Sequence, residues 1–164
     1  LVGTMNQDSF IENPGEQINS IQNTTLTLYF SNLDGDGLVK EVREDVYYSS
    51  NISMEKLVVE YLVKGPDIDG VYPVINPGTK ILSVTVKDGI CYVNFDENFM
   101  TQLYNVTADV VIYSIANSLV ELPNVNKVQI AVNGKTDIVY RETFNLSNLY
   151  ERNLDLLKTG ENVE

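Results

Sequence analysis

The residues with the most obvious chemical potential are carboxylates in loops. In the run NLDGDGLV, Asn32, Asp34 and Asp36 occupy positions 1, 3 and 5 of a calcium-binding loop, and Gly37 occupies position 6. Such a loop needs a bidentate glutamate at position 12, where this chain has Arg43. A cation in place of the carboxylate predicts a tight acidic turn between two strands and no functional metal site.

Paired carboxylates are a second candidate for chemistry, because glycosidases hold two of them at a fixed separation around a sugar. Asp67 and Asp69 on one side, and Asp96 and Glu97 on the other, are the pairs that the sequence offers. Nothing in the sequence brings these two pairs together. With 23 acidic residues in the chain, such pairs arise by chance, and we interpret these side chains as solvated loop charges.

Two features of the composition argue against other catalytic chemistry. The chain has no histidine, which removes the commonest general base and the main zinc ligand. Its one cysteine, Cys91, lies in a strand-like run and is expected to be a buried thiol with no base to activate it. We therefore predict no catalytic residue, no bound cofactor and no metal.

The charge balance narrows the class of partner. The chain has 11 basic and 23 acidic residues, a net charge of −12, and its basic residues are scattered singly along the sequence. Nucleic-acid binding needs clustered Lys and Arg to neutralise phosphates, and anionic lipid attracts similar clusters. We expect neither nucleic acid nor an anionic membrane surface as a partner.

The remaining patterns predict the elements that must position these groups. Apolar periodicity predicts helices at 54–64, capped by Ser53, and at 108–120, capped by Thr107. Alternation of apolar and polar residues predicts strands. The last predicted element is a helix at the C-terminal end. The strands are expected at 24–30, at 38–48, at 81–87 and 90–95 (a hairpin joined by Asp88-Gly89, with Leu82, Val84 and Val86 on one face), and at 127–132; the final helix is expected at 149–158.

The order of these elements predicts an α+β domain at 24–152, between a flexible leader at 1–23 and a polar tail at 153–164. Two helices would pack on one face of a mostly antiparallel sheet, in the order strand, strand, helix, hairpin, helix, strand. A crossover through the second helix should return the strand at 127–132 parallel to the strand at 90–95.

Exposed tyrosines and one long loop suggest where a partner would bind. Tyrosine is enriched at interfaces because it buries a large area and keeps a polar group. The apolar stripe of the second helix faces the core, which leaves its back free. The candidate interaction surface therefore comprises Tyr113 and Ser114 on that back, Tyr104 before the helix, and Asp67, Asp69 and Tyr72 in the proline-containing loop 67–77.

Several segments, taken in order, resemble the GerMN domain of bacterial sporulation and spore-germination proteins. They are a helix that ends in Gly-Pro, an approach to a hairpin, the Asp-Gly hairpin itself, a strand that follows Leu-Pro, and a closing Leu-Ser segment. In this chain they read YLVKGP (61–66), PGTKILSV (77–84), VKDGICYVNF (86–95), LPNVNKVQIAVNG (122–134) and NLSNLYER (145–152).

The resemblance implies a fold similar to ring-building-motif modules and no catalytic residues. It implies an extracytoplasmic protein, membrane-anchored through a segment upstream of Leu1, that works as an interaction domain in the envelope machinery of sporulation or germination. Expected partners are other envelope or sporulation proteins, with a second copy of the chain or peptidoglycan as alternatives. A cell-wall glycan-binding module is the alternative function, and a carboxylate-based hydrolase is the less favoured third.

Overall fold

The computed structural model describes residues 20–158, and the leader predicted at 1–23 therefore lies mostly outside the described residues. The chain begins with a long antiparallel ribbon of β1 (Ile21–Ser31) and β2 (Leu38–Ser49), followed by helix α1 (Met54–Lys64). The first strand thus starts three residues before the predicted position, because the ribbon continues past the part that is packed on the core.

A three-stranded sheet forms the other side of the molecule. Strands β3 (Ile81–Lys87) and β4 (Ile90–Phe95) make the predicted hairpin, and both turn residues have positive φ, 55° at Asp88 and 80° at Gly89. Helix α2 (Ala108–Val120) leads to β5 (Lys127–Val132), which pairs parallel with β4 as predicted. The sheet order is β3-β4-β5.

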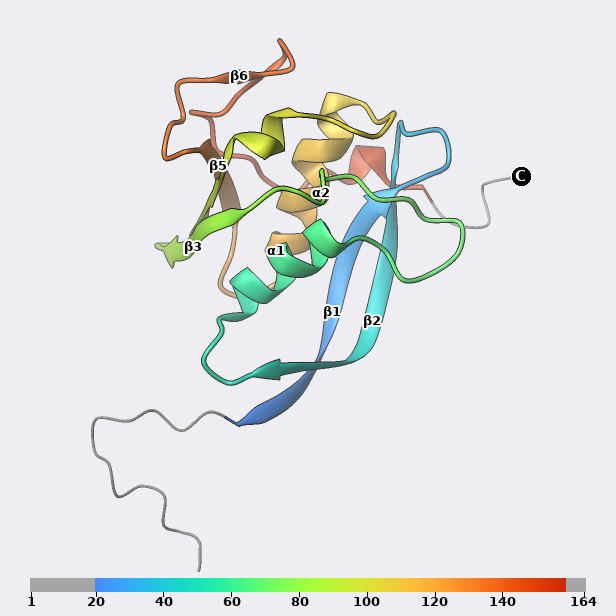
Figure 1. The fold of residues 1–164 in the computed structure, drawn as a ribbon, viewed down its shortest axis with the longest axis vertical. Coiled ribbons are helices and arrows are strands. Elements are labelled where there is room, and N and C mark those ends of the chain that lie inside the picture. The colour runs from blue at the N-terminus through green and yellow to red at the C-terminus, as the bar shows by residue number, and fades with distance from the viewer. Residues whose placement is uncertain (1–19, 159–164) are drawn as a thin grey trace, which may run out of the picture.

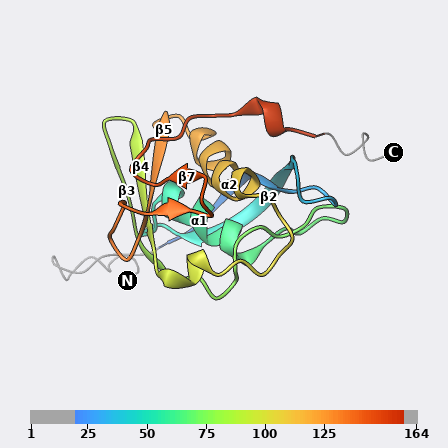
Figure 2. The same cartoon turned by 90° about the horizontal axis from the view of Figure 1, so that it is seen from above.

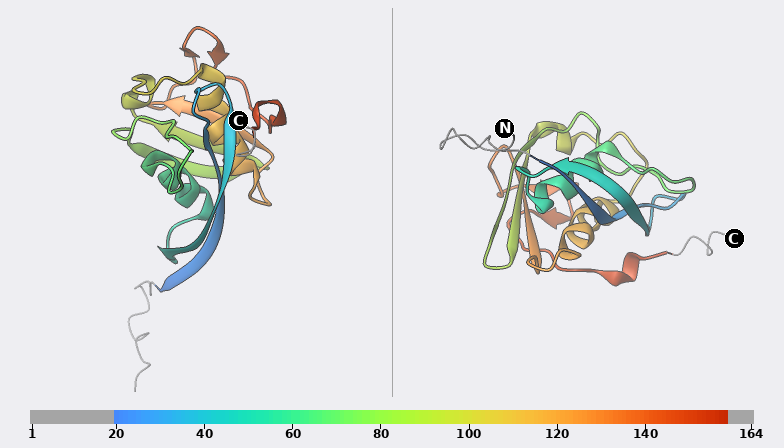
Figure 3. Two further views of the ribbon diagram at one scale, coloured as in Figure 1. Left: turned by 90° about the vertical axis from the view of Figure 1, so that its right-hand side faces the viewer. Right: turned by 90° about the horizontal axis from the view of Figure 1, so that it is seen from below.

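The helices lie between the ribbon and the sheet, so the α+β class is confirmed (Figures 1 and 2). The side view shows that the far part of the ribbon extends beyond the helices (Figure 3). Short strands β6 (Val139–Tyr140) and β7 (Phe144–Asn145) form a third, small sheet near the N-terminal half of α2. No helix between residues 20 and 158 has both the length and the apolar character that crossing a membrane requires.

Three local predictions can be compared with these elements. Ser53 caps α1, since its hydroxyl accepts the N–H of Lys56 at 3.1 Å, whereas Thr107 stands at the cap position of α2 but its hydroxyl bonds to Asp109. Leu82 does not share a face with Val84 and Val86, because a bulge between Ile81 and Ser83 shifts the register and leaves Leu82 exposed.

The helix predicted at 149–158 is wrong. That segment is extended apart from one 3-10 turn, Leu154–Leu156, and it runs beside other elements. Tyr150 exchanges backbone hydrogen bonds with Val128 of β5, and the N–H of Lys158 donates to the carbonyl of Leu38 in β2. These backbone bonds to neighbouring strands take the place of helical ones.

Candidate functional site

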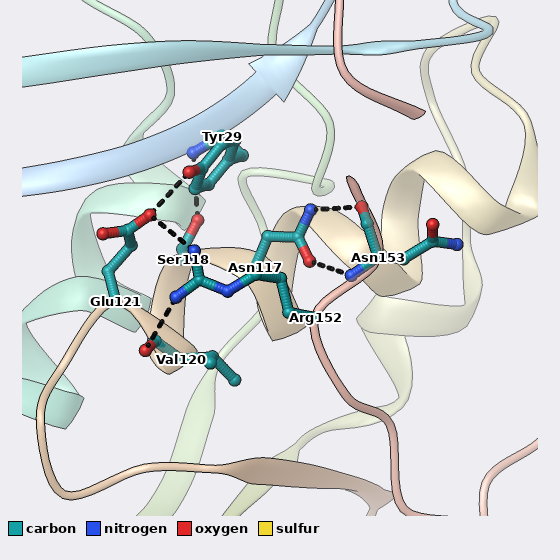
Figure 4. A network of polar contacts seen from close by, with 7 residues as sticks. All are labelled: Tyr29, Asn117, Ser118, Val120, Glu121, Arg152 and Asn153. Atoms are coloured by element: carbon teal, nitrogen blue, oxygen red, sulfur yellow. Dashed lines mark hydrogen bonds and ion pairs between the residues drawn. The ribbon is translucent and has the colours of Figure 1, made fainter. Parts of the chain in front are cut away.

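The back of α2, where we expected a free surface, is covered by β1. Ser114 is fully buried, and its hydroxyl donates to the carbonyl of Tyr29 at 2.6 Å. The hydroxyl of Ser118, one turn later, accepts the N–H of Tyr29 at 2.9 Å (Figure 4). The prediction that Ser114 is exposed is therefore wrong. Two small hydroxyl side chains satisfy the backbone of β1 on the edge that β2 does not occupy.

The C-terminal segment covers another side of the same helix. The side-chain amide of Asn117 donates to the carbonyl of Asn153 and accepts its N–H, both at 2.9 Å (Figure 4). The hydroxyl of Tyr29 donates to the carboxylate of Glu121 at 2.6 Å, and Arg152 lies 3.5 Å from that carboxylate. Asn153, which we assigned to the tail, and the neighbouring Arg152 thus cover this side of the helix.

Tyr113 is half-buried rather than exposed. Its ring meets the rings of Phe144 and Tyr150 edge to face, with centroids 6.2 and 6.0 Å away. Burial raises the pKa of the Tyr113 hydroxyl above its ordinary value. The sequence pattern placed Tyr113 off the apolar stripe, but it could not show that Phe144 and Tyr150 would pack against its ring.

The other predicted residues lie on loops that meet at one end of the molecule. The turn 32–37 and the first part of the following loop, 66–72, lie together there, on the side away from the three-stranded sheet (Figure 2). Ser31 and Tyr72 exchange backbone hydrogen bonds of 3.0 and 2.9 Å, and the N–H of Thr107 donates to the carbonyl of Gly35 at 2.9 Å. Three segments that are distant in sequence are therefore joined through their backbones.

These loops expose four large apolar side chains. Leu33 is 69% exposed, Leu103 58%, Ile68 47% and Tyr72 40%. We call this set the loop-end surface. Asp67 and Asp69 are exposed on the same loops, as are Asp34 and Asp36, whereas Tyr104 is half-buried against the core. Our sequence interpretation missed Leu33 and Leu103, although a leucine inside a polar turn was the signal that could have found them.

A hollow of about 530 Å³ opens beside this end, between β2 and the end of α1. Beneath it, buried Glu41 pairs with the guanidinium of Arg43 at 2.8 Å and accepts the N–H of Asp67 at 3.2 Å. Arg43 also donates to the carbonyl of Gly65 at 3.1 Å. Arg43, which the calcium-loop pattern places where a glutamate is needed, thus joins β2 to the end of α1.

Two cations lie over the ring of Tyr61 in this hollow. The guanidinium carbon of Arg43 is 5.4 Å from the ring centroid and the ammonium of Lys64 is 4.9 Å from it. Tyr47 of β2, 63% exposed, also lines the hollow, as do the carboxylates of Glu44, Asp45 and Asp67. The hollow therefore combines aromatic rings with charges of both signs.

Two of the carboxylates considered for catalysis, Asp96 and Glu97, make hydrogen bonds that stabilise local structure. Asp96 caps a 3-10 helix by accepting the N–H of Asn98 at 3.2 Å, and it also accepts the N–H of Lys80 at 3.0 Å. The amide of Asn133 donates to Glu97 and lowers the pKa of that carboxyl. Within residues 20–158, acidic and thiol side chains form no group of three that could hold a metal ion.

Comparison with known proteins gives the family. A family model described as "Germane: Sporulation and spore germination" matches residues 27–138, and no curated protein matches the chain significantly. The fold is similar to the "Tandem GerMN domains of the sporulation protein GerM from Bacillus subtilis", with a TM-score of 0.67 and 22% identity over 83% of this chain and 48% of that one. This chain therefore spans about half the length of that tandem structure.

Two single-domain structures are also similar. One is described as "Putative Lipoprotein from Clostridium perfringens" (TM-score 0.53, 22% identity, 79% of this chain and 87% of that one). The other is the first GerMN domain of the Bacillus subtilis protein (TM-score 0.53, 19% identity, 74% and 92%). The family model extends from the middle of β1 to the residue before β6, and the chain accordingly belongs to the Germane family of sporulation and spore-germination domains.

Proposed function

We propose that this domain is a non-enzymatic protein-interaction domain of the bacterial cell-envelope machinery for sporulation or spore germination. It works on the extracytoplasmic side and is anchored to the membrane through a segment upstream of Leu1. The family match supports the biological setting. The similarity to a structure described as a lipoprotein supports the location.

The observation that carries the docking role is the loop-end surface. Apolar side chains on loop tips are usually turned inward or replaced by polar residues, and clustered exposed ones mark interaction sites. Here Leu33 and Leu103 are both more than half exposed, although they come from loops about 70 residues apart in sequence. A backbone hydrogen bond from Thr107 to Gly35 joins the two loops that carry these side chains.

The test is the localisation of the labelled full-length protein in sporulating cells. Changing Leu33→Glu together with Leu103→Glu should abolish localisation, because apolar contacts at the centre of an interface each contribute about 2 kcal/mol or more. The matched control is Leu82→Glu with Ile21→Glu, two apolar residues that are 49% and 74% exposed on strands away from these loops. Both double variants should melt close to wild type, since exposed sites tolerate charge. Normal localisation of the loop variant would refute the docking role of this surface.

Cell-wall glycan binding is the second candidate, and the hollow beside Tyr47 favours it. Aromatic rings next to carboxylates can contact both the apolar face and the hydroxyls of a sugar. However, Arg43 and Lys64 lie over the ring of Tyr61, which leaves Tyr47 as the aromatic side chain for such stacking. Co-sedimentation with insoluble peptidoglycan, lost in Tyr47→Ala and kept in Tyr92→Ala, would support this candidate. Absence of the protein from the pellet would reject it.

A further inference from the structure

We infer that the loop-end surface takes a basic protein partner, one whose contact face places apolar side chains among lysines and arginines. This inference rests on the proposed docking function and specifies the chemistry of the partner. It follows from the charge of the three loops, from their apolar residues and from the charge of the whole chain.

The three loops carry negative charge only. Segments 32–37, 66–72 and 101–107 contain four aspartates, Asp34, Asp36, Asp67 and Asp69, and no lysine or arginine. None of the four takes part in the ion pairs found among residues 20–158. The Asp36 carboxylate is held in place by the side-chain amide of Asn32 at 2.9 Å. Lys64 lines the same hollow as Asp67, and the side chain of Lys158 lies against Gly37, but neither forms an ion pair with the four aspartates. A partner's cations would therefore meet carboxylates that form no ion pair within residues 20–158.

Hydrogen bonds restrain the loops that carry the apolar residues among these charges. The side-chain oxygen of Asn32 accepts the N–H groups of Asp36 and Gly37 at 3.1 and 3.0 Å, which shapes the turn that presents Leu33. The amide of Gln102, next to Leu103, donates to the carbonyl of Val74 at 3.3 Å. These bonds restrain the backbone of both loops, so less backbone entropy is lost when the leucines are buried by a partner.

The charge of the whole chain decides between classes of partner. A second copy of this chain has a net charge of −12 and would be repelled by the four aspartates. Anionic lipid is repelled for the same reason. A basic protein face gains both charge complementarity, which speeds association, and burial of the four apolar side chains.

Nuclear magnetic resonance with model peptides tests the chemistry directly. The labelled chain is titrated with a synthetic amphipathic peptide of leucine and lysine, and with its leucine–glutamate counterpart of the same length. The lysine peptide should bind at least tenfold more tightly and should shift amide signals in segments 32–37, 66–72 and 101–107. Equal binding of the two peptides, or shifts confined to other segments, would overturn the inference.

Charge variants provide the matched control. Changing the four loop aspartates to asparagine should weaken binding of the lysine peptide at least tenfold and reduce its dependence on salt concentration. Asp88→Asn, Asp137→Asn, Glu142→Gln and Glu151→Gln together remove the same charge elsewhere and should change binding less than threefold. An equal loss in both quadruple variants would show that net charge alone acts, and would overturn the inference.

The same variants separate this inference from the proposed function in cells. If the Leu33 and Leu103 variant mislocalises while the four-asparagine variant localises normally, docking stands and the basic partner is rejected. If both variants localise normally, both proposals fall. Mislocalisation of both variants, with normal localisation of the control quadruple variant, supports both.

Discussion

Cys91 is the only cysteine of the chain, and its thiol faces the core from β4. It lies on the same face of the strand as Val93 and Phe95, so it is surrounded by apolar groups and acts as a small hydrophobic residue, as the sequence predicted. Burial raises the pKa of the thiol to about 12. A thiol that stays protonated is a poor nucleophile, which agrees with a structural role.

This raised pKa predicts a pH dependence of stability. In the unfolded chain the thiol ionises near pH 8.5, whereas in the folded chain it stays protonated until about pH 12. Rising pH therefore favours the unfolded state from about pH 8.5 upward. Between pH 8 and pH 10 the free energy of unfolding should fall by about 2 kcal/mol more in wild type than in Cys91→Val. Urea unfolding at several pH values measures this, and parallel curves for the two proteins would contradict it.

Two glycines in the loops give a second prediction at this scale. Gly35 and Gly70 both have positive φ, 78° and 83°, but a side chain at Gly35 would lie 1.9 Å from the carbonyl oxygen of Asn105. A side chain at Gly70 would meet nothing within 4 Å.

Gly70→Ala should therefore cost about 1 kcal/mol, for the left-handed backbone alone. Gly35→Ala should cost several times as much, because the two loops must separate. Thermal melting of the two variants compares them. Equal losses would show that the loops at this end are not in close contact.

At the scale of elements, the unexpected feature is that helix side chains bind the free backbone groups at the edge of a strand. The N–H and the carbonyl of Tyr29 point away from β2, toward α2, where Ser118 and Ser114 bind them. The two serines are four residues apart and so lie on one face of the helix. Serine fits here because it is short enough to let strand and helix approach and still supplies a donor and an acceptor.

Removing either serine hydroxyl should destabilise the domain. Ser118→Ala leaves the buried N–H of Tyr29 unpaired, and Ser114→Ala leaves its carbonyl unpaired; each should lower the free energy of unfolding by about 1–3 kcal/mol. Ser83→Ala, at an exposed position in β3, is the control and should change it by less than about 0.5 kcal/mol. Denaturant unfolding gives the three values. A loss at Ser83 as large as at Ser118 would argue against a β1–α2 contact.

At the scale of the whole molecule, α2 is enclosed and the two ends of the domain differ. The ribbon, the sheet and the C-terminal segment surround the helix, so its surface is used for folding (Figures 1 and 2). The large apolar side chains that stay exposed lie on loop tips and at outward-facing strand positions such as Leu82, and none lies on α2. Under the proposed function, stability and docking depend on different regions, and a substitution in one region should spare the other.

Tyr113→Glu and Leu103→Glu test this separation. Tyr113 packs against Phe144 and Tyr150, and the aromatic contact and the burial of a charge together should cost about 2–4 kcal/mol. Leu103 is 58% exposed, so its variant should keep the wild-type stability within about 0.5 kcal/mol. Melting curves for both variants decide the point. A stable Tyr113→Glu variant would mean that the face of α2 is free after all.

The sequence by itself determined the elements whose signals are local. The period of apolar residues defined α1 and α2, Asp88-Gly89 defined the β3–β4 hairpin, and the order of motifs led to the GerMN family. Each of these depends on neighbours within a few residues, because helix faces repeat every 3.6 residues and strand faces every two. The cap by Ser53 and the burial of Cys91 were also predicted from neighbouring residues in the sequence.

Only the tertiary structure decided which surfaces stay exposed. Ser114 is polar and lies off the apolar stripe, yet it is buried because Tyr29, 85 residues away, needs a hydrogen-bond partner. Leu33 is apolar, yet it is exposed because its turn is held outward by Asn32 and by the contact of Gly35 with the segment before α2. The C-terminal segment is extended because its backbone binds β5 and β2. Burial at these positions depends on contacts between residues far apart in the chain, and local sequence patterns do not carry that information.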